Sequence, residues 1–68
     1  MPKRLSSAEF IRILTDHDFR FISQKGSHTK YRNELGQTVI IPHPRKDIPI
    51  GTLRSMIRQS GLPGELFD

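Results

Sequence analysis

The sequence predicts an α+β domain in which two helices cover one face of a three-stranded antiparallel sheet, in the order helix, strand, strand, strand, helix. Three observations lead to this prediction. A helix-capping signal opens an amphipathic stretch near the start, three short segments rich in aromatic and β-branched residues follow, and a second amphipathic stretch ends at a glycine. A chain of 68 residues has room for one domain, which we place at residues 1–68.

The first helix is predicted over residues 7–17. Ser6 suits the N-cap position, and Glu9 suits the reciprocal bond of a capping box. Leu5 before the cap and Phe10 after it have the spacing of a hydrophobic staple. The inner face repeats at helical intervals and consists of Phe10, Ile13, Leu14 and His17.

Three strands are predicted where aromatic and β-branched side chains concentrate, at residues 19–25, 28–33 and 37–42. Gly36 marks the hairpin turn between the last two strands and is expected at a positive φ. Gly26 is a candidate for a β-bulge that would re-aim His28. Pro42 and Pro44 end the third strand, because proline has no N–H to donate to the ladder.

The second helix is predicted to start near Pro49, because proline is favoured in the first turn of a helix. Gly61 suits the left-handed position just after the helix, and Leu62 suits the hydrophobic contact that accompanies such caps. Its inner face is expected to consist of Ile50, Leu53, Met56, Ile57 and Ser60. Residues 61–68 are interpreted as a short tail. The expected core consists of Phe10, Ile13, Leu14, Phe21, Tyr31, Val39, Ile41, Leu53 and Ile57.

The composition indicates which kinds of binding partner and which cellular compartment to expect. Eleven Lys and Arg against seven Asp and Glu give a net charge of +4. This balance suits a nucleic acid or an acidic protein as partner, and it equally suits a basic domain with a solvated surface. The chain has no Cys, no signal-peptide pattern and no apolar run long enough to span a membrane. We therefore expect a cytoplasmic protein that does not bind membranes.

The most suggestive side chain is His28. Alternation along the second strand places His28, Lys30 and Arg32 on one face, which we expect to be open because Tyr31 on the other face should meet the helices. Cations such as Lys25, Lys30 and Arg32 attract a phosphodiester backbone and can stabilise a charged phosphorane, while an imidazole moves protons near neutral pH. From these patterns alone, however, an exposed strand histidine of no special role is the favoured alternative.

The other histidines have simpler interpretations. His17 is expected to cap the first helix or to pack at the edge of the core. His43, just after the third strand, could be a second acid–base group, but a loop or RNA-contact role is favoured over catalysis. No metal or other cofactor is expected, because the sequence has no cysteine and no H-x-x-x-H pair, and three adjacent residues such as Asp16-His17-Asp18 cannot readily converge on one ion.

Several short motifs follow one another along the chain, namely KGSH at 25–28, Tyr31, VIIPH at 39–43, IPIGTLRSMI at 48–57 and SGL at 60–62. In this order and spacing they resemble the HicA-type mRNA interferase toxins, the YcfA-like family, and the resemblance extends from Ser6 to Phe67. One departure is Asp18, where members commonly have glycine. Aspartate tolerates the left-handed conformation better than most residues, so the turn can survive.

The resemblance implies a fold like that of double-stranded-RNA-binding domains and a toxin of a type II toxin–antitoxin system. It implies a metal-independent endoribonuclease that cleaves mRNA, with His28 as the catalytic residue, and a HicB-type antitoxin that blocks the site. With this resemblance the catalytic interpretation of His28 becomes the favoured one. The residues expected to contact RNA are Lys25, Ser27, Lys30, Arg32, His43 and Lys46.

Two alternatives remain open at this point. One is a non-catalytic RNA-binding module of the same fold, although such modules depend on lysines near the start of the second helix, and here only Arg45 and Lys46 precede it. The other is a protein-binding adaptor whose basic face meets an acidic partner. Loss of RNA cleavage on replacing His28 would separate the enzyme from both.

Overall fold

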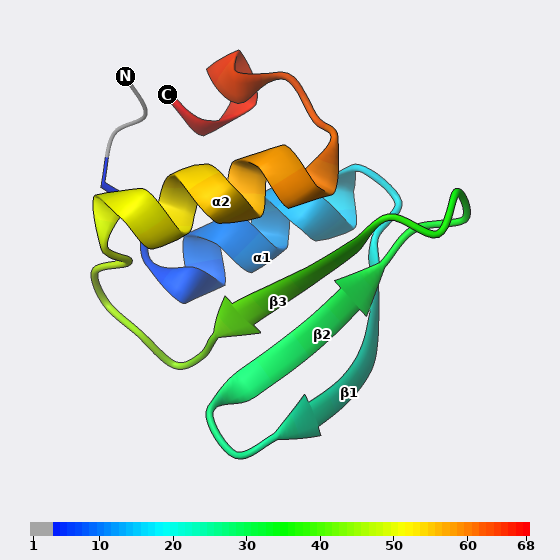
Figure 1. Ribbon diagram of the computed structural model, residues 1–68, viewed down its shortest axis with the longest axis horizontal. Coiled ribbons are helices and arrows are strands. Elements are labelled where there is room, and N and C mark those ends of the chain that lie inside the picture. The colour runs from blue at the N-terminus through cyan, green and yellow to red at the C-terminus, as the bar shows by residue number, and fades with distance from the viewer. Residues whose placement is uncertain (1–3) are drawn as a thin grey trace.

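The computed structural model describes residues 4–68, and its elements follow the predicted order (Figure 1). The helices are α1 (Ser7–Asp16) and α2 (Ile50–Ser60). The strands are β1 (Arg20–Lys25), β2 (His28–Arg32) and β3 (Thr38–Pro42), and a short 3-10 helix, η1 (Gly64–Phe67), follows α2. The predicted α+β class and α-β-β-β-α layout are confirmed.

Local signals in the sequence account for both ends of α1. The Ser6 hydroxyl accepts a hydrogen bond from the Glu9 N–H (3.1 Å), and the Glu9 carboxylate accepts one from the Ser6 N–H (3.0 Å), which completes the predicted capping box. His17 forms the C-cap, and its Nδ1 lies 2.8 Å from the carbonyl oxygen of Ile13, which confirms a capping role. Asp18 then adopts a positive φ of 69°, as expected for its place before β1.

The two ends of α2 also follow from the sequence. Pro49 occupies the N-cap and Gly61 the C-cap, where Gly61 has a left-handed φ of 69°. The predicted inner face is largely confirmed, because Leu53, Met56 and Ser60 are buried and Ile57 packs at the edge of the core. Ile50 was wrongly placed on this face and is exposed.

The sheet is a simple antiparallel meander with the order β1-β2-β3. Both helices lie on one side of it and pack mainly over β3, the strand nearest to them in Figure 1. On β2 the residues facing the helices, Thr29 and Tyr31, are buried, whereas His28 and Arg32 are exposed. The predicted division of β2 into two faces is therefore confirmed.

The core includes residues near both ends of the chain that were not predicted to belong to it, Leu5 and Phe67. Phe67 is completely buried and its ring stacks on that of Phe10, with centroids 4.9 Å apart. The interpretation of residues 61–68 as a tail was wrong, because η1 returns this aromatic ring to the core. The buried apolar residues are Leu5, Phe10, Leu14, Phe19, Tyr31, Val39, Ile41, Ile48, Leu53, Met56 and Phe67.

Phe21 was wrongly placed in the core and is 54% exposed. It lies directly opposite Tyr31 and contacts it edge to face, with ring centroids 5.8 Å apart. Opposed residues share a face, so Phe21 does point toward the helix side. However, β1 is the edge strand farthest from the helices, and all six of its residues are exposed.

The structure also corrects the position of the bulge. Gly26 and Ser27 form a two-residue turn in which Gly26 has a φ of 59°, so the glycine allows the turn and does not form a bulge. The irregularity lies instead at Ile22, the residue that the register between Phe21 and Ser23 leaves unpaired. At the other hairpin, Gly36 has the expected positive φ.

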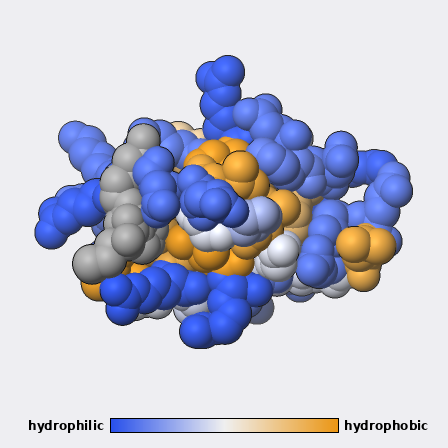
Figure 2. Space-filling model, turned by 90° about the horizontal axis from the view of Figure 1, so that it is seen from above, coloured by the Kyte–Doolittle hydropathy of each residue, from blue (hydrophilic) through white to orange (hydrophobic). Residues whose placement is uncertain are grey.

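Seen from the helical side in Figure 2, hydrophobic side chains still show between hydrophilic ones. This is expected of a chain of 68 residues, because so small a domain cannot cover its core completely. Within residues 4–68 neither helix has the length and hydropathy needed to cross a membrane.

Candidate nucleic-acid interface

His28 begins β2 immediately after the Gly26-Ser27 turn. The register pairs His28 directly with Lys25 on one side and with Pro42 on the other. Directly opposed residues of an antiparallel pair have Cβ atoms about 4.5–5.5 Å apart and point to the same face. Neither the imidazole of His28 nor the ammonium of Lys25 makes a hydrogen bond or ion pair within residues 4–68, so both groups are available to a ligand.

The register defines the sheet face turned away from the helices, which we call the open face. Its residues are Arg20, Ser23, Lys25, His28, Lys30, Arg32, Thr38, Ile40 and Pro42. Four of them are Lys or Arg, and none of the three strands contains an Asp or Glu. The open face therefore combines one imidazole with a uniformly positive surface, which suits a polyanion.

The bulge at Ile22 places a further cation, Arg20, on the open face. Arg20 and Lys25 are five residues apart, so in a regular strand they would point to opposite faces. The unpaired residue adds one position to β1, and Arg20 consequently lies opposite Arg32 while Lys25 lies opposite His28. Arg20 was missed as a site residue because a bulge has no clear signal in the sequence.

The comparison with protein families gives a match that covers most of the chain. The model of the family described as the HicA toxin of bacterial toxin–antitoxin systems matches residues 7–62, which include both helices and all three strands. This chain belongs to the HicA toxin family. No curated protein sequence matches it.

In this HicA-family toxin, Arg32 does not lie beside His28. The two residues are at opposite ends of β2, four positions and about 13 Å apart at a rise of about 3.3 Å per residue. The Nε of Arg32 donates a hydrogen bond to the Thr38 hydroxyl (2.9 Å), which holds the side chain across the sheet at its own end. The cations next to His28 are therefore Lys25 and, two positions along β2, the half-buried Lys30.

His43 lies close to His28 in the ladder but belongs to the other face. Its N–H donates to the Ser27 carbonyl oxygen (2.7 Å), which extends the β2–β3 pairing by one residue beyond His28 and Pro42. The ring is half-buried, and its Nδ1 lies 2.7 Å from the hydroxyl of Ser7 at the start of α1. His43 thus faces the helix layer and does not join His28 in one acid–base pair on the open face.

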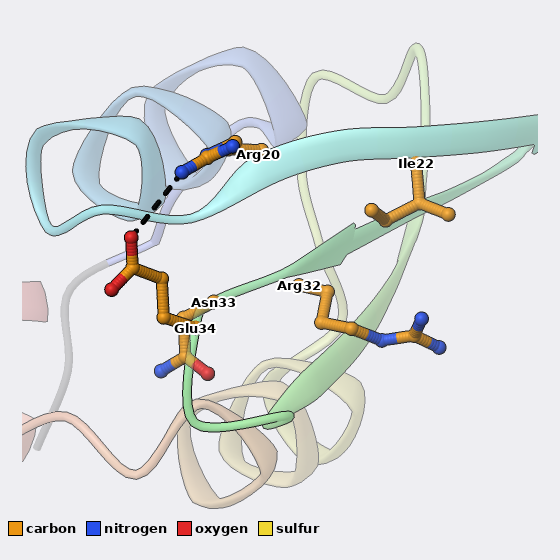
Figure 3. Close-up of a pocket in the computed structure, with 5 residues that line it drawn as sticks. All are labelled: Arg20, Ile22, Arg32, Asn33 and Glu34. Atoms are coloured by element: carbon orange, nitrogen blue, oxygen red, sulfur yellow. Dashed lines mark hydrogen bonds and ion pairs between the residues drawn. The ribbon is translucent and has the colours of Figure 1, made fainter.

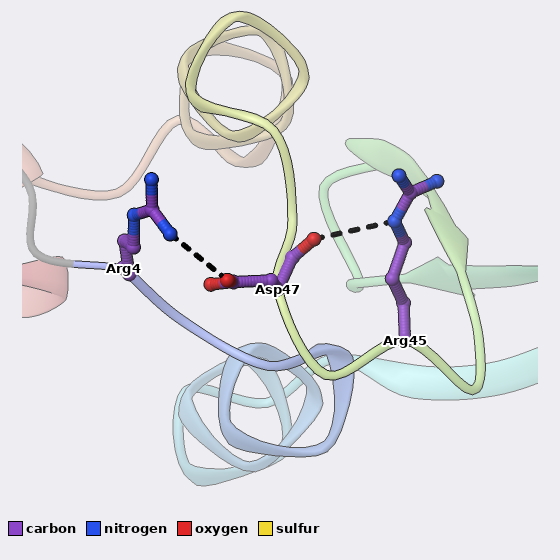
Figure 4. A network of polar contacts seen from close by, with 3 residues as sticks. All are labelled: Arg4, Arg45 and Asp47. Carbon is purple, nitrogen blue, oxygen red and sulfur yellow. Dashed lines mark hydrogen bonds and ion pairs between the residues drawn. The ribbon is translucent and has the colours of Figure 1, made fainter.

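Ser7 ties the segment after β3 to α1. Its hydroxyl accepts a hydrogen bond from the Arg45 N–H (2.8 Å), and its own N–H donates to the Arg45 carbonyl oxygen (2.8 Å). Asp47 adds two links, an ion pair with Arg4 (3.0 Å) and a carbonyl that accepts from Arg45 Nε (3.2 Å), shown in Figure 4. Lys46 is exposed in this tethered loop and does not lie on the open face.

The described residues offer no obvious metal site. Within residues 4–68 no three side chains of His, Asp or Glu are grouped so that they could hold an ion. His17 and its two aspartate neighbours are no exception, because the imidazole Nδ1 already lies within hydrogen-bond distance of the Ile13 carbonyl oxygen. The functional groups that the open face presents are an imidazole, ammonium groups and guanidinium groups.

Proposed function

We propose that this HicA-family toxin is an endoribonuclease that cleaves mRNA in the cytoplasm with His28 as its acid–base group. The observation that carries the proposal is the direct pairing of His28 with Lys25 on a face that has four cationic residues and no carboxylate in its strands. Such a face attracts the RNA backbone to the one imidazole in the sheet.

The proposed reaction uses the nucleophile that RNA itself supplies. The 2′-oxygen attacks the adjacent phosphorus, the bond to the 5′-oxygen of the next nucleotide breaks, and a 2′,3′-cyclic phosphate and a 5′-hydroxyl end result. The 2′-hydroxyl proton is removed and a proton reaches the leaving oxygen, and His28 serves one of these transfers. Lys25 stabilises the additional negative charge that develops on the phosphorane oxygens.

Control of the toxin is proposed to come from a HicB-type antitoxin that covers the open face. Carboxylates of the antitoxin would approach Lys25, Lys30 and Arg32 and hide His28. Ile40 is exposed and Pro42 half-buried on the same face, so they offer the apolar contacts that contribute most to affinity. The charges would mainly raise the association rate and the specificity.

The test replaces His28 by alanine and follows cleavage of a single-stranded RNA. Because His28 is exposed and its ring has no partner within residues 4–68, His28→Ala should keep the unfolding midpoint while the cleavage rate falls by on the order of 10²–10⁴. His17→Ala is the matched control, since it removes an exposed histidine that only caps α1.

Undiminished cleavage by His28→Ala would refute the catalytic role. RNA binding by the parent protein without any cleavage would instead identify a non-catalytic RNA-binding module. That function has less support, because the first turn of α2 has no basic residue and only Arg45 and Lys46 lie just before it.

A further inference from the structure

A second group of charged residues lies at the end of the open face that is farthest from His28. Its members are Arg20, Arg32 and Glu34. Arg20 and Arg32 are directly opposite each other across the β1–β2 ladder, an arrangement that destabilises a sheet through repulsion of like charges. Glu34 relieves only part of this repulsion. Its carboxylate lies 3.3 Å from a terminal nitrogen of Arg20, and within residues 4–68 it makes no hydrogen bond or ion pair with Arg32. Unfavourable local charge of this kind is expected where a residue serves a ligand.

The guanidinium of Arg32 is held in place but not neutralised. Its Nε is occupied by Thr38, whereas its two terminal nitrogens have no hydrogen bond or ion pair within residues 4–68. Figure 3 shows the guanidinium extending away from the Arg20–Glu34 ion pair. A positioned guanidinium with two free terminal nitrogens is suited to bind two oxygens of a phosphate.

An apolar surface adjoins this cation. Ile22, the bulged residue, is 46% exposed and lines one hollow of about 170 Å³ together with Arg20, Arg32, Asn33 and Glu34 (Figure 3). A nucleotide presents the same pair of properties, a phosphate and an apolar base face. Single-stranded nucleic acids are bound by such combinations of cations and apolar surfaces.

We propose that Arg32, supported by Ile22, binds a phosphodiester group of the RNA that is remote from the bond being cleaved. The inference rests on the proposed function in that RNA is the ligand. Arg32 lies about 13 Å from His28 along β2, too far to act on the scissile phosphate. Lys30 lies between them on the same face, so the cations form a continuous line along the strand. Such a line suits a polyanionic strand better than an isolated carboxylate of a protein.

The first experiment measures binding without cleavage. In a His28→Ala background, the affinity for a single-stranded RNA of about ten nucleotides is followed by fluorescence anisotropy over a range of salt concentrations. Adding Arg32→Gln should weaken binding about tenfold and reduce the slope of log K against log salt by about 0.7, the value for one lost phosphate contact. Adding Ile22→Ser should weaken binding without changing the slope. Adding Arg12→Gln, which removes the same charge from the exposed side of α1, should change neither.

The second experiment uses the active protein and compares a dinucleotide with the longer RNA. Arg32→Gln should leave kcat/KM for the dinucleotide unchanged and lower it about tenfold for the longer strand, because only the longer strand reaches the remote site.

An equal loss on both substrates would overturn the proposal, since Arg32 would then act at the scissile phosphate. An unchanged salt slope would overturn it as well, as would weaker binding of the antitoxin with no change in RNA affinity. If the parent protein cleaves nothing, the proposed function fails, while the binding experiment still decides whether Arg32 contacts RNA.

Discussion

Lys25 and His28 lie directly opposite each other across the β1–β2 ladder, with only Gly26 and Ser27 between them in the sequence. The tight turn brings a cation and an imidazole to adjacent positions of one face. This pairing explains why a Gly-Ser dipeptide precedes the histidine, because glycine at the first turn position accepts the positive φ that a turn of this length requires.

The pairing leads to a prediction for Lys25. Lys25→Ala should lower the rate of RNA cleavage by on the order of 10², because it removes the charge closest to the proposed phosphorane. Lys25→Arg should restore most of the activity, since it returns a cation to the same position. Arg12→Ala removes an equal charge from α1 and should leave the rate unchanged. Rates measured under single-turnover conditions separate this effect from weaker binding, and a loss that appears only in binding would contradict the assignment.

A second prediction concerns the chemistry of cleavage. Activity should persist in EDTA and should produce ends with a 2′,3′-cyclic phosphate or its hydrolysis product, because the proposed nucleophile is the 2′-hydroxyl of the substrate. A substrate with a single 2′-deoxy nucleotide at the cleaved position should remain intact. Mass spectrometry of the fragments identifies the ends. Activity that disappears with the chelator and returns with magnesium would contradict the proposed mechanism.

A third prediction concerns the antitoxin. Lys30→Glu combined with Arg32→Glu should slow association with the antitoxin encoded beside the toxin gene, and the effect should shrink at high salt because exposed charges are screened. Arg12→Glu combined with Arg54→Glu makes the same change of charge on the helices and serves as the control. Association kinetics at two ionic strengths measure both variants. If the first pair has no effect at low salt, the antitoxin does not dock on the open face.

A fourth prediction concerns stability and compares Gly51, within α2, with Gly61, which caps the end of this helix. Gly61→Ala should lower the free energy of unfolding by about 1–2 kcal/mol, because the left-handed conformation is unfavourable for alanine and the amide of Gln37 occupies the space of the new methyl group. Gly51→Ala, in the first turn with no atom near the added carbon, should instead raise it by about 0.5–1 kcal/mol. Urea unfolding measures both, and equal effects would contradict the assigned cap.

The sequence by itself determined the elements and much of the open face. Ser6 and Glu9 determine the start of α1, and Gly61 determines the end of α2, because caps depend on hydrogen bonds and backbone angles within a few residues. Alternation along a short regular strand was enough to place His28 on the side opposite Tyr31. The family resemblance carried by these motifs is confirmed over residues 7–62.

The tertiary structure decided what depends on contacts between distant segments. Phe21 is exposed because the helices pack mainly over β3, two strands away from β1, whereas Phe67 is buried because η1 folds back onto Phe10. His43 faces Ser7 because the ladder continues one residue beyond Pro42. Arg20 joins the open face because an unpaired residue at position 22 reverses the alternation of β1, and only the partner strand determines where such a residue is inserted.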